Sequence, residues 1–363
     1  MSRRRSHFLT RDRIEQTGAF IASQQRPSGE IPWYGGGKMD PWDHVHSAMG
    51  LVRVGRLDAA RAAFRWLERT QEPCGGWVAE RRGDEVVNRA VETNHAAYLA
   101  TGLWYYERAT GDVDFLATCW PMLERAIDFV VGMQDETGAI RWAINKYGEV
   151  WDAPLLTGSS STYGSLVCAV RIAERLGHDR PAWRRAKQRL AHVLRTDLGR
   201  FARADLPEKT DHYSMDWYYP VLGGAMRGLD AWRRLFDPAH TRRFVTEGVG
   251  ARCLADKPWY TIAETCELVL AYDAIGLAQR ARQILSWIAP MRTRQGGYWT
   301  GRTHPDGELF PKGEQTAWTA TTVLMADDAL AGDSATSSFF RDLGEGQADE
   351  LARRLLRPAL SVV

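Results

Sequence analysis

The chain has 363 residues, of which 44% are hydrophobic and 25% charged, with a formal net charge of +2. This composition is typical of a globular protein, and the small charge argues against nucleic acid or an acidic polymer as the partner. No apolar run reaches the roughly 18 residues that a membrane span needs. The basic first residues are not followed by the apolar core of a signal peptide.

Length and cysteine usage bear on the organisation and on the compartment. Closed helical barrels reach this length as one domain, so we expect residues 1–363 to form a single domain. The five cysteines are scattered along the chain and include no Cys-x-x-Cys pair. An odd, scattered set is expected to stay reduced, which predicts a cytoplasmic location.

Six segments share one design, in which a polar or acidic opening is followed by a helix that is apolar on all sides. In the first, MDPWDHVHSAMG, Asp40 can cap the helix, Pro41 suits its first position and Asp43 lies one turn inside. The others are predicted over Asn88–Ala109, Ser159–Leu176, Ser214–Leu229, Thr261–Ile275 and Glu314–Leu330. The openings recur roughly every 50 residues, which indicates a repeat of supersecondary units.

Amphipathic helices are predicted between these segments. They cover Arg11–Gln25, Leu57–Gln71, Val113–Gln134, Arg180–Asp197, Thr241–Leu254 and Ala278–Arg292. In Leu57–Gln71, Ala63 and Phe64 lie on the apolar face, whereas Glu68 lies on the polar face. Helices that are apolar all round must be covered on all sides, so we expect six inner helices within six outer ones. The sequence therefore predicts an all-α (α/α)6 barrel.

Two smaller elements are added to this barrel. Residues 139–151 alternate apolar and polar side chains around a turn at Lys146–Gly148, which predicts a short β-hairpin over the rim. Residues 337–356 are predicted to form an extra C-terminal helix outside the ring.

The links after the outer helices repeat a Gln, a Gly turn and a Trp, as in Gln71–Trp77 and Gln134–Trp142. They resemble degenerate repeats of terpene cyclases. The whole arrangement resembles the (α/α)6 barrels of six-hairpin glycosidases, sugar 2-epimerases and prenyltransferase toroids, which host many reactions. The MDPWDH segment and the Glu-Thr-x-Glu segment at Glu264 are similar to actinobacterial prenyltransferase-like proteins, which include an endo-α-mannosidase of methylmannose polysaccharide. The resemblance implies a pocket at the N-terminal ends of the inner helices.

The predicted openings of the inner helices carry acids and many aromatic residues. The acids are Asp40, Asp43, Glu92, Asp216, Glu264 and Glu314. A cap or a favourable helix dipole explains any one of them, and Thr261-x-x-Glu264 matches a capping box. Six like charges converging on one axis would repel one another, however, and such crowding indicates function. Carboxylates among aromatic rings suit a neutral sugar polymer, because two of them can serve as acid and base.

These residues predict a glycoside hydrolase acting on a neutral oligosaccharide or polysaccharide, and the resemblance implies inversion and an α-mannan such as methylmannose polysaccharide. We expect Glu264 to be the general acid and Asp43 or Asp40 the base. Substrate contacts are predicted for Trp42, His44, Glu92, His95, Tyr213, Asp216, Trp217, Tyr260 and Glu314.

The same residues bear on a metal site, on a cofactor and on two other functions. A metal site at Asp43, His44, His46 and His95 is not expected, because His44 and His46 point to different faces of a helix. No cofactor is expected either, since Gly35–Gly37 lacks the Lys-Ser/Thr of a phosphate loop. A sugar epimerase would use paired histidines as acid and base. A non-catalytic toroid binding an isoprenoid or a partner protein would have a wholly apolar cavity, against which the acidic helix openings argue.

Overall fold

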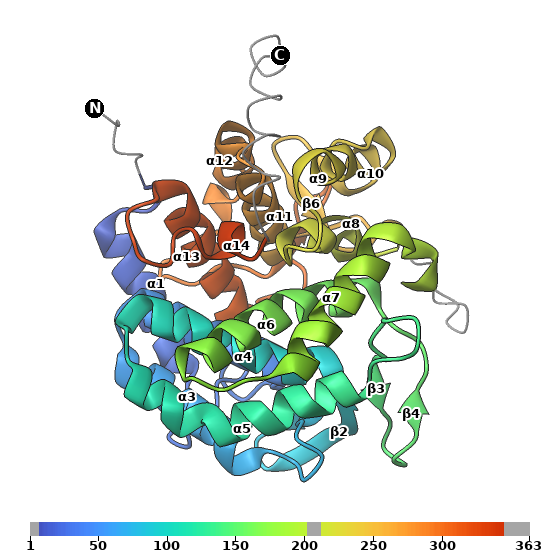
Figure 1. The fold of residues 1–363 in the computed structure, drawn as a ribbon. Coiled ribbons are helices and arrows are strands. Elements are labelled where there is room, and N and C mark those ends of the chain that lie inside the picture. The colour runs from blue at the N-terminus through green and yellow to red at the C-terminus, as the bar shows by residue number, and fades with distance from the viewer. Residues whose placement is uncertain (1–6, 202–211, 345–363) are drawn as a thin grey trace.

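The computed structural model describes residues 7–201 and 212–344, and it is built mainly from helices (Figure 1). The inner ring consists of α2 (Pro41–Arg53), α4 (Thr93–Thr110), α6 (Leu156–Arg175), α8 (Ser214–Leu222), α11 (Ile262–Ala274) and α13 (Ala317–Ala331). Each inner helix packs against the next, and α13 packs back against α2, so the ring closes. The closure is reinforced by Asp327 of α13, whose Oδ1 accepts hydrogen bonds from the backbone N–H groups of Phe8 and Leu9.

The outer layer covers this ring. It consists of α1 (Arg11–Gln24), α3 (Leu57–Thr70), α5 (Val113–Gly132), α7 (Pro181–Thr196), the two short helices α9 (Gly228–Leu235) and α10 (Pro238–Phe244), and α12 (Ala278–Ser286). In α3, Ala63 and Phe64 are buried and Glu68 is exposed, as the amphipathic pattern predicts. The prediction of an (α/α)6 barrel is confirmed.

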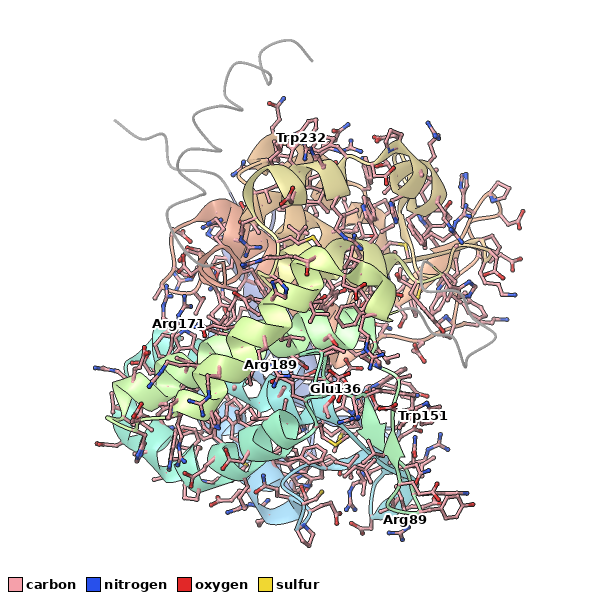
Figure 2. All side chains as sticks on the ribbon, turned by 45° about the vertical axis from the view of Figure 1, so that its right-hand side comes forward. Arg89, Glu136, Trp151, Arg171, Arg189 and Trp232 are labelled. Atoms are coloured by element: carbon pink, nitrogen blue, oxygen red, sulfur yellow. The ribbon has the colours of Figure 1, made fainter. Side chains whose placement is uncertain are left out.

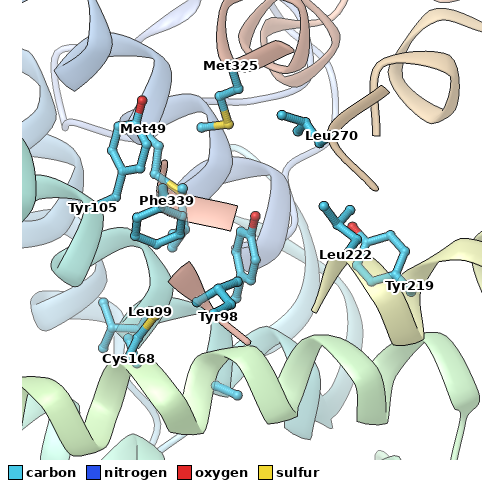
Figure 3. Close-up of a cluster of buried hydrophobic side chains, with 14 of the residues drawn as sticks. Met49, Tyr98, Leu99, Tyr105, Cys168, Tyr219, Leu222, Leu270, Met325 and Phe339 are labelled. Atoms are coloured by element: carbon cyan, nitrogen blue, oxygen red, sulfur yellow. The ribbon is translucent and has the colours of Figure 1, made fainter. Parts of the chain in front are cut away.

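The interior of the barrel is a packed core. Residues 96–103 of α4 are all buried, because α2 and α6 flank the helix and α5 covers its outer side. Side chains from all six inner helices gather in one hydrophobic cluster (Figure 3), among them Met49, Leu99, Cys168, Leu222, Leu270 and Met325. The short helix α14 (Phe339–Asp342) adds Phe339, whose ring lies 5.1 Å from that of Tyr105.

Two four-stranded antiparallel sheets lie where inner helices begin. The first contains β1 (Val78–Arg82), β2 (Glu85–Glu92), β3 (Ala143–Ile144) and β4 (Val150–Trp151). The second contains β5 (Val245–Thr246), β6 (Gly250–Arg252), β7 (Trp259–Thr261) and β8 (Gly301–Thr303). Strand β2 leads directly into α4, and β7 leads directly into α11. The predicted hairpin over 139–151 is confirmed as β3–β4, whereas the other strands were not predicted.

Several predicted helices differ from the observed ones. The helix predicted over Ser214–Leu229 ends at Leu222, and the helix predicted over Ala278–Arg292 ends at Ser286. The helix predicted over Asn88–Ala109 begins only at Thr93, because residues 85–92 pair with β1 as a strand. The helix predicted over Thr241–Leu254 is wrong beyond Phe244, where glycines with positive φ at 248 and 250 accompany two short strands. Of the extra helix predicted over 337–356, residues 339–342 are helical, and residues 345–356 lie outside the described residues.

Within residues 7–201 and 212–344, no helix combines the length and the apolar character that crossing a membrane requires.

Candidate active site

The first turn of α2 carries the two aspartates predicted from the sequence. Asp40 caps the helix as expected, and its Oδ1 accepts a hydrogen bond of 2.9 Å from the Asp43 N–H. Its Oδ2 accepts one of 2.8 Å from Trp33 Nε1. Two N–H donors thus hold the Asp40 carboxylate against the start of the helix.

Asp43 is buried beside this cap. Burial, the negative charge of Asp40 and that of Glu267 raise the pKa of its carboxyl well above the usual range. A raised pKa favours the protonated form of the carboxyl, which is the form that a general acid needs. Asp43 is therefore chemically suited to donate a proton.

Glu264 lies in the first turn of α11 and is buried. The predicted capping box is wrong, since the Thr261 side chain makes no capping hydrogen bond in the structure. Among the described residues, Glu264 Oε2 is buried without a hydrogen-bond partner. An unpaired buried acceptor is destabilising by about 1–3 kcal/mol, so capping does not explain this side chain, whose free oxygen can still accept a hydrogen bond.

One turn further along α11 lies Glu267, which the sequence analysis did not select. Its carboxylate accepts hydrogen bonds of 2.5 and 2.6 Å from the hydroxyl groups of Tyr218 and Tyr219 on α8. Burial, and then the charge of Glu264, raise its pKa to about 8. The spacing of three residues between Glu264 and Glu267 places both on one face of the helix, and this signal could have identified Glu267.

Aromatic residues connect α2, α4 and α8 around these acids. The Trp42 ring stacks on Tyr98 at 4.3 Å, and it lies 5.9 Å from the Tyr219 ring. The Tyr98 hydroxyl is 2.9 Å from His46 Nδ1. Since burial lowers the pKa of His46 to about 4, this imidazole is neutral. A cavity of about 20 Å³, enough for one water molecule, lies beside Glu267 and is also lined by His46, Tyr98 and Tyr219.

Polar atoms at the starts of α4, α6 and α13 are also available. Within the part of the chain that the structure describes, several are buried without a hydrogen-bond partner, namely Asn94 Oδ1, His95 Nδ1, Ser159 Oγ and Trp318 Nε1. Beside them, Glu92 Oε2 accepts a hydrogen bond from Trp142 Nε1 and lies 3.5 Å from His95 Nε2. Sugar hydroxyls can both donate to and accept from such groups.

Glu314 and Asp216 are engaged with neighbouring segments. Glu314 precedes α13, which Thr316 caps, and its Oε1 accepts a hydrogen bond of 3.0 Å from Thr300. Asp216 Oδ1 accepts hydrogen bonds from the N–H and the hydroxyl of Thr157, so this carboxylate stabilises the start of α6. Tyr213 is partly exposed immediately before α8.

The prediction that His44 contacts substrate is wrong. Its Nδ1 accepts a hydrogen bond from the Ile31 N–H at 3.0 Å, and its Nε2 lies 3.1 Å from the Ala63 carbonyl oxygen. The ring is fully buried, which lowers its pKa to about 4. Both ring nitrogens contact backbone groups, so His44 connects α2 to the segment at Ile31 and to α3 at Ala63.

The predictions for Trp217 and Tyr260 are also wrong. Trp217 Nε1 donates to the Arg234 carbonyl oxygen at 2.7 Å, which places the ring against the outer helix α9. The Tyr260 hydroxyl accepts a hydrogen bond from Arg252 and is 2.7 Å from Thr246 Oγ1 within the second sheet. Both residues are at most 2% exposed and cannot reach a ligand.

A pH dependence of stability follows from Glu267. Its pKa is 4.5 when unperturbed and about 8 in the folded protein, so the folded state holds this proton more tightly. The contribution of this proton to the free energy of unfolding is fully present below about pH 4.5. It is lost as the pH rises through about 8, where the buried carboxyl must ionise. The amide of Gln cannot ionise, so Glu267→Gln is expected to flatten the fall in melting temperature between pH 5 and 8. An unchanged slope in Glu267→Gln, measured beside the exposed Glu174→Gln, would contradict this assignment.

No group of three or more His, Cys, Asp or Glu side chains arranged to hold a metal ion occurs in 7–201 or 212–344.

Known proteins resemble this chain in sequence and in fold. No family model matches the chain. It is 43% identical over 350 residues to the MMP endo-(1,4)-3-O-methyl-alpha-D-mannosidase of Mycolicibacterium hassiacum, which covers 94% of this chain and 93% of the relative.

Solved structures share the fold at low identity. A glycosidase superposes with a TM-score of 0.65 at 14% identity, covering 92% of this chain and 97% of that chain. A D-mannose isomerase gives a TM-score of 0.65 at 12% identity, covering 88% and 96%. At this low identity, these structures show only that the barrel fold is shared. Membership of a family is shown by the M. hassiacum sequence, which matches nearly the whole chain. The chain therefore belongs to the family of the M. hassiacum endo-mannosidase and is a glycoside hydrolase.

Proposed function

We propose that the enzyme cleaves internal α-(1→4) bonds in chains of 3-O-methyl-D-mannose. Two observations support the proposal: the carboxyl of Asp43 at the start of α2 has a raised pKa, and Glu264 at the start of α11 has one buried oxygen with no hydrogen-bond partner among the described residues. Hydrolysis with inversion requires one carboxyl group that acts as acid and a second that acts as base, on either side of the glycosidic bond. The relative that is 43% identical acts, by its name, on this kind of linkage.

In this proposal Asp43 is the general acid and protonates the oxygen of the leaving sugar. Glu264 is the base and takes a proton from the water that attacks the anomeric carbon. This assignment reverses the roles expected from the sequence, because the raised pKa favours a protonated Asp43. Asp40, fixed by two N–H donors, adds a nearby negative charge that helps Asp43 to retain its proton.

The lining of the site suits a partly methylated sugar. A 3-O-methyl group removes one hydrogen-bond donor and adds an apolar surface, which aromatic rings accept. Trp42, stacked on Tyr98, supplies such a surface, while Asn94, His95 and Trp318 offer polar atoms for the remaining hydroxyls. The chain would thus recognise both the apolar and the polar edges of each unit.

We further propose that the enzyme works in the cytoplasm. All five cysteines are free in the structure, which is usual for proteins of a reducing compartment. The substrate would then be a polysaccharide or oligosaccharide that accumulates inside the cell.

The purified enzyme tests the proposal with methylmannose polysaccharide as substrate. We expect new reducing ends and intermediate chain lengths early in the reaction, as endo action produces. Proton NMR in the first minutes should show the β-anomer at the new end, because a single displacement on an α-linkage inverts the configuration. Release of single sugars only, or no cleavage beside an active control enzyme, would overturn the proposed substrate and mode of attack.

A further inference from the structure

The β3–β4 hairpin carries an unusually exposed aromatic strip. Tyr147 is 75% exposed and Trp151 38% exposed, and the Trp151 ring lies 4.8 Å from the ring of Trp142. The hairpin projects from the body of the barrel in Figure 1, and Trp151 lies on its outer part in Figure 2. Large apolar side chains that face solvent together are characteristic of binding surfaces.

This strip is fixed to the candidate active site. Trp142 Nε1 donates a hydrogen bond of 2.9 Å to Glu92, which precedes α4 and lies beside His95. The backbone N–H of Thr93 donates to the Trp142 carbonyl oxygen at 2.8 Å. A continuous series of contacts thus leads from the start of an inner helix, through Trp142, to the exposed face of Trp151.

The base of the hairpin is held by polar contacts that also suit a neutral ligand. Arg141 Nε and Asp152 Oδ1 form an ion pair of 2.6 Å, and the Trp142 N–H donates to the Ala153 carbonyl oxygen. The two charges next to the tryptophans cancel, so the strip presents aromatic faces flanked by hydrogen-bonding groups. Such a surface matches a sugar ring, which has apolar C–H faces and polar edges.

We propose that Trp142 and Trp151 form a distal subsite, which binds a unit of the same glycan several units away from the bond that is cleaved. The inference rests on the proposed endo action. An internal bond can enter the site only if the glycan extends out of the site in both directions. The hairpin lies beside the start of α4, where we place one of these exits. The subsite thus favours long chains over the short products of their cleavage.

Trp151→Ala tests the subsite, since this ring is exposed and contributes little to the core. The measurement is the ratio of kcat/KM for the long methylmannose polymer to kcat/KM for a short methylmannose oligosaccharide. We expect this ratio to fall about tenfold, mainly through a higher KM for the polymer, and Trp151→Phe to restore most of it. Leu229→Ala, an exposed apolar residue of the outer helix α9, is the matched control and should leave the ratio unchanged.

The outcomes separate this inference from the proposed function. A ratio that stays at the wild-type value in Trp151→Ala, while the wild type cleaves the polymer, overturns the subsite and leaves the function intact. An equal fall of the ratio in Leu229→Ala also overturns it. A wild-type enzyme that does not cleave the polymer at all refutes the proposed function, and the subsite falls with it.

Discussion

Replacing Asp43 by Asn is expected to lower kcat for the methylmannose polymer by roughly 100-fold or more, with little change in melting temperature. The amide has the shape of the protonated carboxyl but cannot transfer its proton to the leaving sugar. The raised pKa favours the neutral carboxyl of Asp43, and the amide of Asn is neutral as well, so the replacement should cost the fold little. Turnover and thermal unfolding of the same preparation check both parts of this expectation.

The role of Asp43 can be separated from mere damage to the site. A glycosyl fluoride needs no proton on its leaving group, so Asp43→Asn should hydrolyse an oligosaccharyl fluoride far better than the polymer, relative to the wild type. Equal loss on both substrates would remove Asp43 from the role of acid. The exposed Glu174→Gln, at the C-terminal end of α6, serves as the control for a carboxyl-to-amide change and should retain full activity.

Replacing Glu264 by Gln is the second change with a large expected effect. The amide cannot accept the proton of the attacking water, so kcat should fall by roughly 100-fold or more. The fold should persist, because Glu264 makes no capping bond to its own helix and one of its oxygens has no partner among the described residues.

Chemical rescue identifies Glu264 as the base. In Glu264→Ala, azide can enter the space of the lost carboxylate and attack the sugar without a base, so added azide should restore turnover and yield a glycosyl azide of inverted configuration. The same addition should not rescue Asp43→Asn on the polymer, whose leaving group still lacks a proton. A Glu264→Ala enzyme that azide leaves inactive, or a Glu264→Gln enzyme with full activity, would contradict the assignment.

The repeated design of the chain was readable from the sequence because it depends on local patterns. An apolar helix such as α4, uninterrupted from Ala96 to Leu103, has to be covered on every side, and this requirement predicts the two rings. Asp40 followed by Pro41 likewise encodes the start of α2 through rules that act within one turn.

The sheets were mostly missed because their pairing partners are distant or ambiguous. Residues 85–92 become a strand only through pairing with β1 and β3, whereas their sequence continues into a strong helix. The segment 245–252 was assigned to a helix although the glycines at 248 and 250 favour a turn. Tertiary pairing outweighed local preference at both places.

The site residues show a related limit, since a sequence gives spacing but not the direction of a side chain. His44 and Trp42 lie two positions apart on α2, yet His44 turns toward backbone groups and Trp42 toward Tyr98. Glu267 was not selected because it lies inside an apolar helix; its spacing from Glu264 hinted at it, and its two hydrogen bonds to the tyrosines of α8 became visible only in the structure.

The closure of the ring between α2 and α13 has a consequence for how the chain folds. The inner helices α4, α6, α8 and α11 obtain both neighbours from adjacent hairpins, whereas α2 and α13 each obtain one neighbour from the opposite end of the sequence. Contacts between residues so distant along the chain slow folding, because their loop entropy must be overcome first. One flank of α2 therefore stays uncovered during synthesis until α13 has left the ribosome. A circular permutant with joined ends, opened at another link, would move this late step to a different pair of helices while keeping the same native barrel.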